Sequence, residues 1–468
     1  MKEQTPFDVA IIGTGPGGYV AAIRAGQLGL KTAVIEKDTR YGGTCLLRGC
    51  IPTKALLRDA HLFQEVKRAV QQGLFNTGDI GLDWGKIQDR KKDVVEKMAK
   101  GVEFLFRKNK VTVFKGYGTV VAPNKIEVKG NGTSTEVIAR NIIVATGSEA
   151  KSLPGYNFDE NTVLSNVGVL ELNQIPKSLL VVGSGAVGVE FASIYNSFGT
   201  KVVLIEVLPN IVPLEDEEIS KELKRVFTKK GIEVYTKAKL ESAKPSAGGV
   251  DVTFQTDKGE VKNYTVEKLL MATGRGPNTV NIGLDKIGVA TERGYVKVNE
   301  FMETNVKGVY AVGDIIPSQQ LAHVAMQEGI VAVEKIAGKQ PHPIKYNQVP
   351  ACTYCDPQVA SVGLTEAKAK EAGYKVKVGK FPFTAIGKAK IEDATEGFVK
   401  IVADEQYGEI LGVHMIGNTV TEMIPEGVTA MALEGTVEDM VNMIHAHPTL
   451  AEATHEAMEN VFGAAIHI

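Results

Sequence analysis

The chain contains little cysteine, no long apolar run and no excess of either charge. Its 468 residues include only four cysteines, too few for the disulfide framework of an extracellular scaffold, so a reducing compartment is expected. Lysine and arginine (53) nearly balance aspartate and glutamate (55) and are spread along the chain, which argues against nucleic acid as a partner. No apolar stretch approaches the roughly 18 residues that a membrane span needs, and residues 1–6 are too few for a targeting peptide. A cytoplasmic protein with small-molecule ligands is predicted, and a processed organellar form fits equally well.

Glycine, by contrast, is abundant and organises the chain. A short apolar run followed by glycines at the first, third and sixth positions occurs twice. The glycines are Gly13, Gly15 and Gly18 in the first copy and Gly183, Gly185 and Gly188 in the second. The first glycine of such a motif permits a tight turn after a strand, the second admits a pyrophosphate, and the third lets the helix pack on the strand. Two Rossmann-like domains are predicted, one inserted within the sequence of the other.

Each copy also reaches a carboxylate at the end of a second apolar run, Glu36 in the first and Glu206 in the second. A carboxylate at this position accepts hydrogen bonds from a ribose and repels a 2′-phosphate, so NAD is favoured over NADP. The alternative for one such motif is a tight turn with no ligand, but two complete copies favour cofactor binding. These residues alone do not decide which copy would hold a flavin and which a nicotinamide nucleotide.

Two cysteines, Cys45 and Cys50, lie five residues apart just beyond the first copy. On a regular helix their α carbons would be about 7.5 Å apart, too far for a disulfide, which prefers roughly 5.5–6 Å. Gly49 and Pro52 are residues that break a helix, so a bridge becomes possible. A redox-active pair is predicted, and the alternative is two buried cysteines that only pack.

His447 and Glu452 are a candidate base and its orienting carboxylate. Thiol–disulfide exchange needs a thiolate, and an imidazole can take up and return the proton. A carboxylate on the other ring nitrogen fixes the tautomer. The alternative for Glu452 is a capping box with Thr449 at the start of a helix.

Together these features resemble the pyridine nucleotide-disulfide oxidoreductase family over essentially the whole chain, and in particular its dihydrolipoamide-oxidising members. The resemblance rests on seven segments: 42–54, 145–148, 183–190, 272–275, 311–314, 321–323 and 445–452. It implies an α/β fold with two Rossmann-like dinucleotide-binding domains and a C-terminal α+β dimerisation domain. The implied domains are an FAD-binding domain (1–150), an NAD-binding domain (151–276), a central domain that completes the FAD site (277–345) and an interface domain (346–468).

The resemblance also implies roles for individual residues. Cys45 would exchange with the substrate, Cys50 would lie against the flavin, and His447 would act on the disulfide of the other subunit of an obligate homodimer. Lys54 would lie near the flavin and pair with Glu190, although each is by itself an ordinary charged residue. The implied FAD and NAD contacts are Gly13, Gly15, Gly18, Glu36, Gly43, Thr44, Cys45, Lys54, Gly118, Thr146, Gly147, Ser148, Gly183, Gly185, Gly188, Glu190, Glu206, Ala238, Gly274, Arg275, Asp314 and Ala322. No metal site is predicted.

The implied activity is oxidation of protein-bound dihydrolipoyl groups, with electrons passing through FAD to NAD+. The implied partners are lipoyl domains and the acyltransferase core of a 2-oxoacid dehydrogenase complex, or the carrier protein of glycine cleavage. One alternative is another NAD(P)H-dependent disulfide reductase of the family with a different small disulfide substrate. The other is a nucleotide-sensing flavoprotein without turnover, which the presence of two cysteines and a base disfavours.

Two departures from the family pattern concern residues near cysteines. Leu47 and Arg48 stand where the family usually has Asn-Val, and we hypothesise that Arg48 lowers a thiol pKa or favours acidic substrates. Cys352 and Cys355 form a C-x-x-C. Because strand alternation would direct these two thiols to opposite faces, packing residues are expected rather than a second redox pair.

Overall fold

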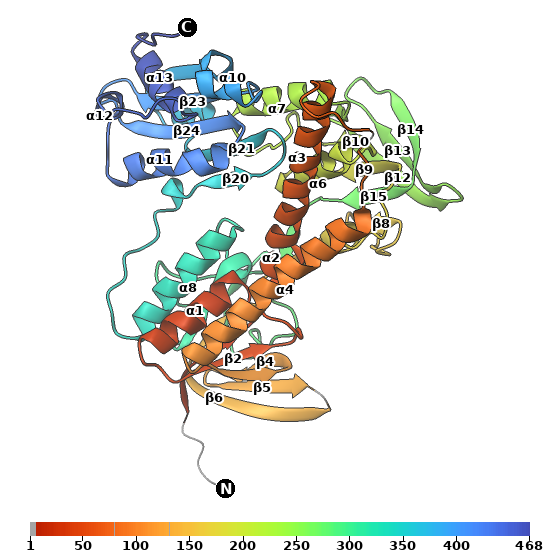
Figure 1. The fold of residues 1–468 in the computed structure, drawn as a ribbon. Helices are drawn as coiled ribbons and strands as arrows, with labels where there is room; N and C mark the ends of the chain where they lie inside the picture. Colours follow the sequence, from red (N-terminus) through yellow and green to blue (C-terminus); the bar gives the residue numbers. More distant parts are fainter. Residues whose placement is uncertain (1–5, 79, 131) are drawn as a thin grey trace. The chain divides into compact units, whose positions relative to one another are not determined.

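The computed structural model describes residues 6–78, 80–130 and 132–468 and divides them between two compact units (Figure 1). Unit 1 comprises the chain up to Ala55, Gly85–Lys151 and Gly274–Ile344. Unit 2 comprises Leu56–Trp84, Ser152–Thr273 and Lys345–Ile468. Unit 1 therefore resumes after the segment that carries the second glycine motif, as the prediction of an inserted domain requires.

Unit 1 is built around a seven-stranded sheet with a parallel core. The order is β3-β2-β1-β6-β5-β4, and β19 pairs with β6 on a branch. The strands are β1 (Phe7–Ile12), β2 (Thr32–Glu36), β3 (Thr112–Lys115), β4 (Tyr117–Ala122), β5 (Lys125–Gly130), β6 (Thr133–Val144) and β19 (Val309–Ala311). Val9, Ala10 and Ile11 of β1 are fully buried, the continuous apolar run expected of a parallel strand covered on both faces. Val309 lies opposite Ile142 in parallel register, so the chain returns to the first sheet after the segment that carries the second glycine motif.

Helices cover the unit 1 sheet, and two short strand pairs complete it. In Figure 1, α1 and α8 lie side by side. The helices that lie wholly in this unit are α1 (Pro16–Gln27), α2 (Gly43–Arg48), η1 (Gly313–Ile315) and α8 (Ala322–Ile336). The strand pairs are β7 (Ser148–Ala150) with β16 (Arg275–Pro277), and β17 (Thr291–Glu292) with β18 (Tyr295–Val296). The division between units falls within α3 (Cys50–Gln71) and at the first residue of α4 (Trp84–Lys108).

Unit 2 contains the second parallel sheet, in the order β11-β10-β9-β15-β8, and a three-stranded antiparallel sheet. The parallel strands are β8 (Val163–Leu164), β9 (Ser178–Val182), β10 (Lys201–Ile205), β11 (Glu233–Tyr235) and β15 (Lys268–Met271). The antiparallel strands are β12 (Lys239–Ser246), β13 (Gly249–Gln255) and β14 (Val261–Val266). The helices of this part are α5 (Asn166–Leu170), α6 (Ala186–Ser197) and α7 (Glu217–Lys229). The order of β9, α6 and β10 repeats that of β1, α1 and β2.

The C-terminal part of unit 2 is an antiparallel sheet with helices, as predicted for an α+β domain. Its strand order is β20-β21-β24-β23-β22. The strands are β20 (Ala351–Thr353), β21 (Gln358–Gly363), β22 (Val376–Pro382), β23 (Phe398–Asp404) and β24 (Ile410–Gly417). The helices are η2 (Tyr346–Gln348), α9 (Glu366–Glu371), η3 (Phe383–Ala385), α10 (Gly387–Ile391), α11 (Val420–Ala432), α12 (Val437–Val441) and α13 (Glu452–Val461). The predicted fold class is confirmed, while the boundaries 1–150, 151–276, 277–345 and 346–468 stay predictions.

None of the helices in the described ranges has both the length and the apolar character needed to cross a lipid bilayer.

The third glycine of the first motif should be essential for stability. A Cβ on Gly18 would lie 2.0 Å from the carbonyl oxygen of Gly13, so Gly18→Ala must push α1 off β1. We expect a loss of about 1–3 kcal/mol of stability, seen as a lower melting temperature in calorimetry. Gly101, inside α4, has nothing within 4 Å of the position that a Cβ would take, so Gly101→Ala should stabilise by about 0.5–1 kcal/mol. Equal effects of the two substitutions would contradict the role assigned to Gly18.

Candidate active site

In the loop formed by the first glycine motif, the first and third glycines pack against backbone atoms, whereas the middle glycine has free space beside it. Gly13 has a φ of +99°, and a Cβ there would lie 2.4 Å from the carbonyl oxygen of Ala145. Gly18 is equally closed, against Gly13 itself. Gly15 has nothing within 4 Å of where its Cβ would be, and it directly precedes the first residue of α1. This loop leaves room for a phosphate at the start of a helix, where free N–H groups favour an anion.

The Glu36 carboxylate, 5% exposed, is fixed at the end of β2 beside this loop. Its Oε2 accepts hydrogen bonds from the backbone N–H (2.9 Å) and the hydroxyl of Thr14. Its Oε1 accepts one from the Asp38 N–H at 2.8 Å. A carboxylate offers about four acceptor positions, so three bonds orient the group and leave capacity for a ribose hydroxyl.

The second motif repeats this geometry contact for contact. Gly183 has a φ of +95° and faces the Ala272 carbonyl as Gly13 faces that of Ala145, while the position of a Cβ on Gly185 is again open. The Glu206 Oε2 accepts hydrogen bonds from the Ser184 N–H and hydroxyl, both at 2.8 Å, and Oε1 accepts one from the Leu208 N–H at 2.9 Å. The residues present therefore fit two dinucleotides, one in each unit.

The two cysteines lie on either side of a helix break. Helix α2 ends at Arg48, Gly49 has φ −145° and ψ −115°, and α3 begins at Cys50, so the predicted interruption is confirmed. A Cβ on Gly49 would lie 2.9 Å from the Thr44 carbonyl oxygen, so glycine permits the close turn. The side chains of Cys45 and Cys50 are thiols in hydrogen-bond contact.

The surroundings keep Cys45 protonated in this dithiol form. Its hydrogen bond with Cys50, together with burial, raises the pKa of the Cys45 thiol well above its usual value, and the nearby Lys54 acts in the opposite direction. A thiol with a raised pKa supplies little thiolate at neutral pH. Disulfide exchange at this pair therefore needs a proton acceptor from elsewhere.

Arg48 forms an ion pair with Asp38, and Asp38 is also the residue whose N–H binds Glu36. The Asp38 carboxylate therefore partly offsets the positive charge that Arg48 brings to the neighbourhood of the thiols. Its hypothesised effect on a thiol pKa stays a prediction, while its pairing links the dithiol helix to the end of β2.

Ser148, Arg275 and Asp314 form a polar cluster in unit 1, which the pairing of β7 with β16 brings together. The Arg275 Nε donates to the Ser148 hydroxyl at 2.7 Å and Nη2 to its carbonyl oxygen at 2.6 Å. The Ser148 hydroxyl in turn donates to Asp314. Burial lowers the pKa of Arg275, whereas the negative charges of Asp314 and of Cys50, when ionised, raise it. Arg275 is therefore close enough to Cys50 for their charges to interact.

Glu328 is a site residue that the sequence analysis missed. It is fully buried on α8 and its Oε2 accepts the Gly313 N–H at 2.6 Å, which fixes the turn that carries Asp314. The available signal was a single carboxylate on the otherwise apolar buried face of α8.

The remaining predicted contacts of unit 1 are distributed over its loops and sheet. A Cβ on Gly43 would lie 2.6 Å from the Gly15 α carbon, so the dithiol segment directly adjoins the first glycine loop. The others are Thr44 in the first turn of α2, Gly118 on β4, Thr146 and Gly147 between β6 and β7, Gly274 before β16, and Ala322 at the start of α8.

In unit 2, Glu452 serves both of the roles considered for it. Its Oε1 lies 2.9 Å from the Nδ1 of His447, and its Oε2 accepts the Thr449 N–H at 2.9 Å. The Thr449 hydroxyl donates to the Ala446 carbonyl and helix α13 begins at Glu452, so only half of the expected capping box is present. Burial acts to raise the pKa of Glu452, but the bonds from Thr449 and His447 outweigh it and hold the pKa below its usual value.

Glu190, on α6, is 3% exposed, and its Oε1 accepts the Tyr354 N–H at 2.9 Å. The neighbouring Cys355 thiol donates to the Pro357 carbonyl at 3.1 Å, and burial raises its pKa well above the usual value. Strand β20 ends at Thr353, so the argument that alternation separates Cys352 from Cys355 is wrong for Cys355. Burial, not alternation, is what makes Cys355 a packing residue.

Ala238 donates its N–H to the Glu206 carbonyl at 2.8 Å, which places it next to Glu206, and its contact with NAD stays a prediction. Among residues 6–78, 80–130 and 132–468, no group of three or more His, Cys, Asp or Glu side chains is arranged to hold a metal ion.

Comparison with known proteins supports these observations along the whole chain. Residues 7–329 match the family described as pyridine nucleotide-disulphide oxidoreductase, and residues 349–458 match its dimerisation domain. The dihydrolipoyl dehydrogenase of Bacillus subtilis is 47% identical, with 99% of both chains covered. The mitochondrial dihydrolipoyl dehydrogenase of Pisum sativum is 44% identical over 98% of this chain and 92% of its own. The crystal structure of LpdA from Mycobacterium tuberculosis has a TM-score of 0.88 at 26% identity, with 97% of this chain and 99% of that chain covered.

Two glycine loops with matching carboxylates, a dithiol beside the first loop and a histidine–carboxylate pair thus occur in a chain that matches one family almost from end to end. The chain belongs to the pyridine nucleotide-disulphide oxidoreductase family.

Proposed function

We propose that this protein is a dihydrolipoyl dehydrogenase, which oxidises protein-bound dihydrolipoyl groups and passes the electrons through FAD to NAD+. The observation that carries the proposal is the Cys45–Cys50 thiol pair, in which Cys45 belongs to the helix α2 that packs against the first glycine loop. Near-full-length relatives with this name support it. The carboxylate of Glu206, bonded to Ser184 and Leu208, favours NAD over NADP because it would repel a 2′-phosphate.

The two glycine loops would hold the cofactors, FAD at Gly15 and Glu36 and NAD at Gly185 and Glu206. When bound, the flavin supplies a two-electron acceptor for the dithiol and NAD+ the final hydride acceptor. Asp314, held by Ser148 and through the Gly313–Glu328 bond, would bind on the flavin side. Lys54, which is near Cys45, is proposed to lie near the flavin.

The protein residues themselves carry out the sulfur exchange. A substrate thiolate attacks Cys45 of the oxidised enzyme, which forms a mixed disulfide and breaks the Cys45–Cys50 bond. The second substrate thiol then displaces Cys45, so that the substrate leaves as a cyclic disulfide and the enzyme keeps both electrons as a dithiol. His447, oriented by Glu452, would take the substrate protons at the dithiol of the other subunit.

A homodimer formed through residues 346–468 completes this proposal. The match to a dimerisation domain supports it, as do the exposed apolar side chains of Leu433, Ile444 and Ile466, which are 77%, 99% and 73% exposed. The proposed substrates are lipoyl domains of a 2-oxoacid dehydrogenase complex or the lipoyl carrier of glycine cleavage. A cytoplasmic location is proposed from the bacterial relatives, and the mitochondrial relatives equally fit a processed organellar form.

The direct test is lipoamide reduction by the FAD-loaded enzyme. We expect rapid NADH oxidation with lipoamide, and little with NADPH or with glutathione disulfide, because Glu206 disfavours the 2′-phosphate. A panel of dithiol and disulfide substrates separates this function from that of another disulfide reductase. No rate with lipoamide would exclude the proposal.

Substitutions in the exchange machinery should separate the two half-reactions. Cys45→Ser should abolish disulfide exchange yet retain flavin reduction by NADH, followed by stopped-flow absorbance. His447→Gln should slow the dithiol half-reaction by about 10²–10⁴-fold, the usual contribution of a general acid–base group. Glu452→Gln should have a smaller effect in the same direction. If His447→Gln slowed the NADH half-reaction equally, its role as the base for thiols would be wrong.

Substitution of the central glycines should separate the two cofactors. A methyl group at Gly15 or Gly185 contacts no protein atom within 4 Å, but it would occupy the space proposed for a pyrophosphate. Gly15→Ala should yield folded protein with little FAD, measured by flavin absorbance after purification. Gly185→Ala should retain FAD and raise the KM for NADH. Normal FAD content in Gly15→Ala would contradict the assignment of the first loop.

A further inference from the structure

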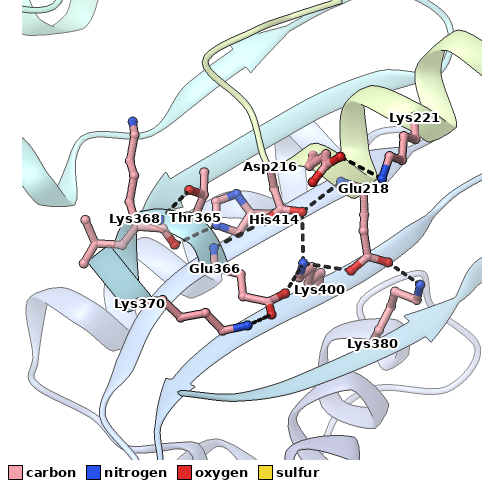
Figure 2. Close-up of polar contacts among 12 residues, drawn as sticks. Asp216, Glu218, Lys221, Thr365, Glu366, Lys368, Lys370, Lys380, Lys400 and His414 are labelled. Atoms are coloured by element: carbon pink, nitrogen blue, oxygen red, sulfur yellow. Dashed lines mark hydrogen bonds and ion pairs between the residues drawn. The ribbon is translucent and has the colours of Figure 1, made fainter. Parts of the chain in front are cut away.

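A lysine is buried among three carboxylates at a distance from both glycine loops in the sequence. Lys400 of β23 is 2% exposed, and its Nζ lies 3.0 Å from Asp216, 2.8 Å from Glu218 and 2.8 Å from Glu366 (Figure 2). Asp216 and Glu218 are at the start of α7, beside the second parallel sheet, and Glu366 begins α9 in the C-terminal part of unit 2. We name these four residues the Lys400 cluster.

Two further lysines balance the charge of the Lys400 cluster. Glu218 also pairs with Lys380 and Glu366 with Lys370, each at 2.5 Å (Figure 2), so three ammonium groups face three carboxylates. Burial acts to lower the pKa of Lys400, but the bonds to the carboxylates outweigh it and raise the pKa above its ordinary value. Removal of one partner from a buried ion pair leaves an uncompensated charge inside the protein and destabilises the fold.

Asp216 connects the Lys400 cluster to two helix starts. Its Oδ1 accepts the Glu218 N–H at 3.0 Å, as the N-cap of α7, as well as the bond from Lys400. Its Oδ2 accepts the Glu366 N–H at 3.3 Å, the first N–H of α9. A carboxylate at a helix N-terminus satisfies free N–H groups and the helix dipole. The position of Asp216 is therefore fixed from both sides.

The segment 207–215 joins this fixed point to the second glycine loop. Its beginning is attached to the loop carboxylate, since the Leu208 N–H donates to Glu206. Its middle is attached to the loop itself, since the Val212 N–H donates to the Ser184 carbonyl at 3.0 Å. The Ser220 hydroxyl in the first turn of α7 donates to the Val212 carbonyl at 3.4 Å. Displacement of the α7 start would therefore be transmitted to Ser184, the residue that orients Glu206.

We propose that Lys400 is a positioning residue for the second dinucleotide site, because it anchors the start of α7 and with it the segment 207–215 that lies against Ser184 and Glu206. The inference rests on the proposed binding of NAD at this site. Lys400 itself contacts no cofactor, and its effect is on the affinity for the nucleotide. The first glycine loop and the dithiol belong to unit 1, and none of the hydrogen bonds and ion pairs named above involves them.

The test compares Lys400→Met with Lys221→Met in the FAD-loaded enzyme. Lys221 lies on α7, is 65% exposed and forms an ion pair with the exposed Glu217. We expect Lys400→Met to raise the KM for NADH, and the Kd for NAD+ measured by calorimetry, by about tenfold, while kcat at saturating NADH changes little. Flavin content and flavin reduction by dihydrolipoamide should stay within about twofold of wild type. Lys221→Met should leave every value unchanged.

Glu366→Gln is a second variant for the case that Lys400→Met does not fold. It is the milder change because Lys400 keeps two carboxylate partners, Asp216 and Glu218. A smaller rise in the Kd for NAD+, again without loss of flavin, is expected. The inference is overturned if either variant binds NAD+ like wild type, or if flavin content and both half-reactions fall together. Wild-type protein that binds NAD+ but does not reduce lipoamide would refute the proposed function alone, whereas no binding of NAD+ would refute both.

Discussion

Each dinucleotide loop depends on one buried carboxylate that holds the end of the second strand against the turn after the first. Glu36 and Glu206 do this with the same three bonds, to a backbone N–H and hydroxyl inside the glycine motif and to an N–H two residues downstream. The bonds satisfy a buried charge that would otherwise be costly. Under the proposed function they would also set where a ribose binds, so the interaction that stabilises the loop would also prepare it for a ligand. The rest of the site is arranged around these two fixed points.

The sequence predicts well those features whose partners are encoded by regular spacing. Strand, glycine and acid follow one another at intervals set by the repeat of a βαβ unit, so both loops, the fold class and the helix break at Gly49 could be anticipated. The hydrogen bonds of Glu328 with Gly313 and of Arg275 with Ser148 could not be anticipated. Arg275 bonds to Ser148, 127 residues away, and no periodic pattern announces such a pair. Long-range contacts between polar side chains arise only when the elements that carry them pack together.

The predictions about Cys355 and Glu452 needed revision for local reasons, since their contacts lie within five residues in the sequence. Cys355 was expected on a strand, but the strand ends at Thr353, and Cys355 is buried beyond its end. Glu452 was considered either as a partner of the histidine or as a capping residue, and it uses one oxygen for each task. A carboxylate has two oxygens that can accept hydrogen bonds from different partners, so Glu452 contacts His447 and the Thr449 N–H at the same time. Bidentate use makes Glu452 a rigid support for His447.

The double use of Asp216 as a capping residue has a consequence for protein engineering and for evolution by recombination. The segment 152–273, which carries the second glycine motif, is continuous in the sequence and could be taken for an exchangeable domain. Its helix α7, however, shares a capping carboxylate with α9 and a buried ammonium group with β23. A chimera that imports this segment from a relative must therefore import compatible residues at 366 and 400 as well. The part of the protein that can be exchanged without loss of these contacts is therefore larger than residues 152–273.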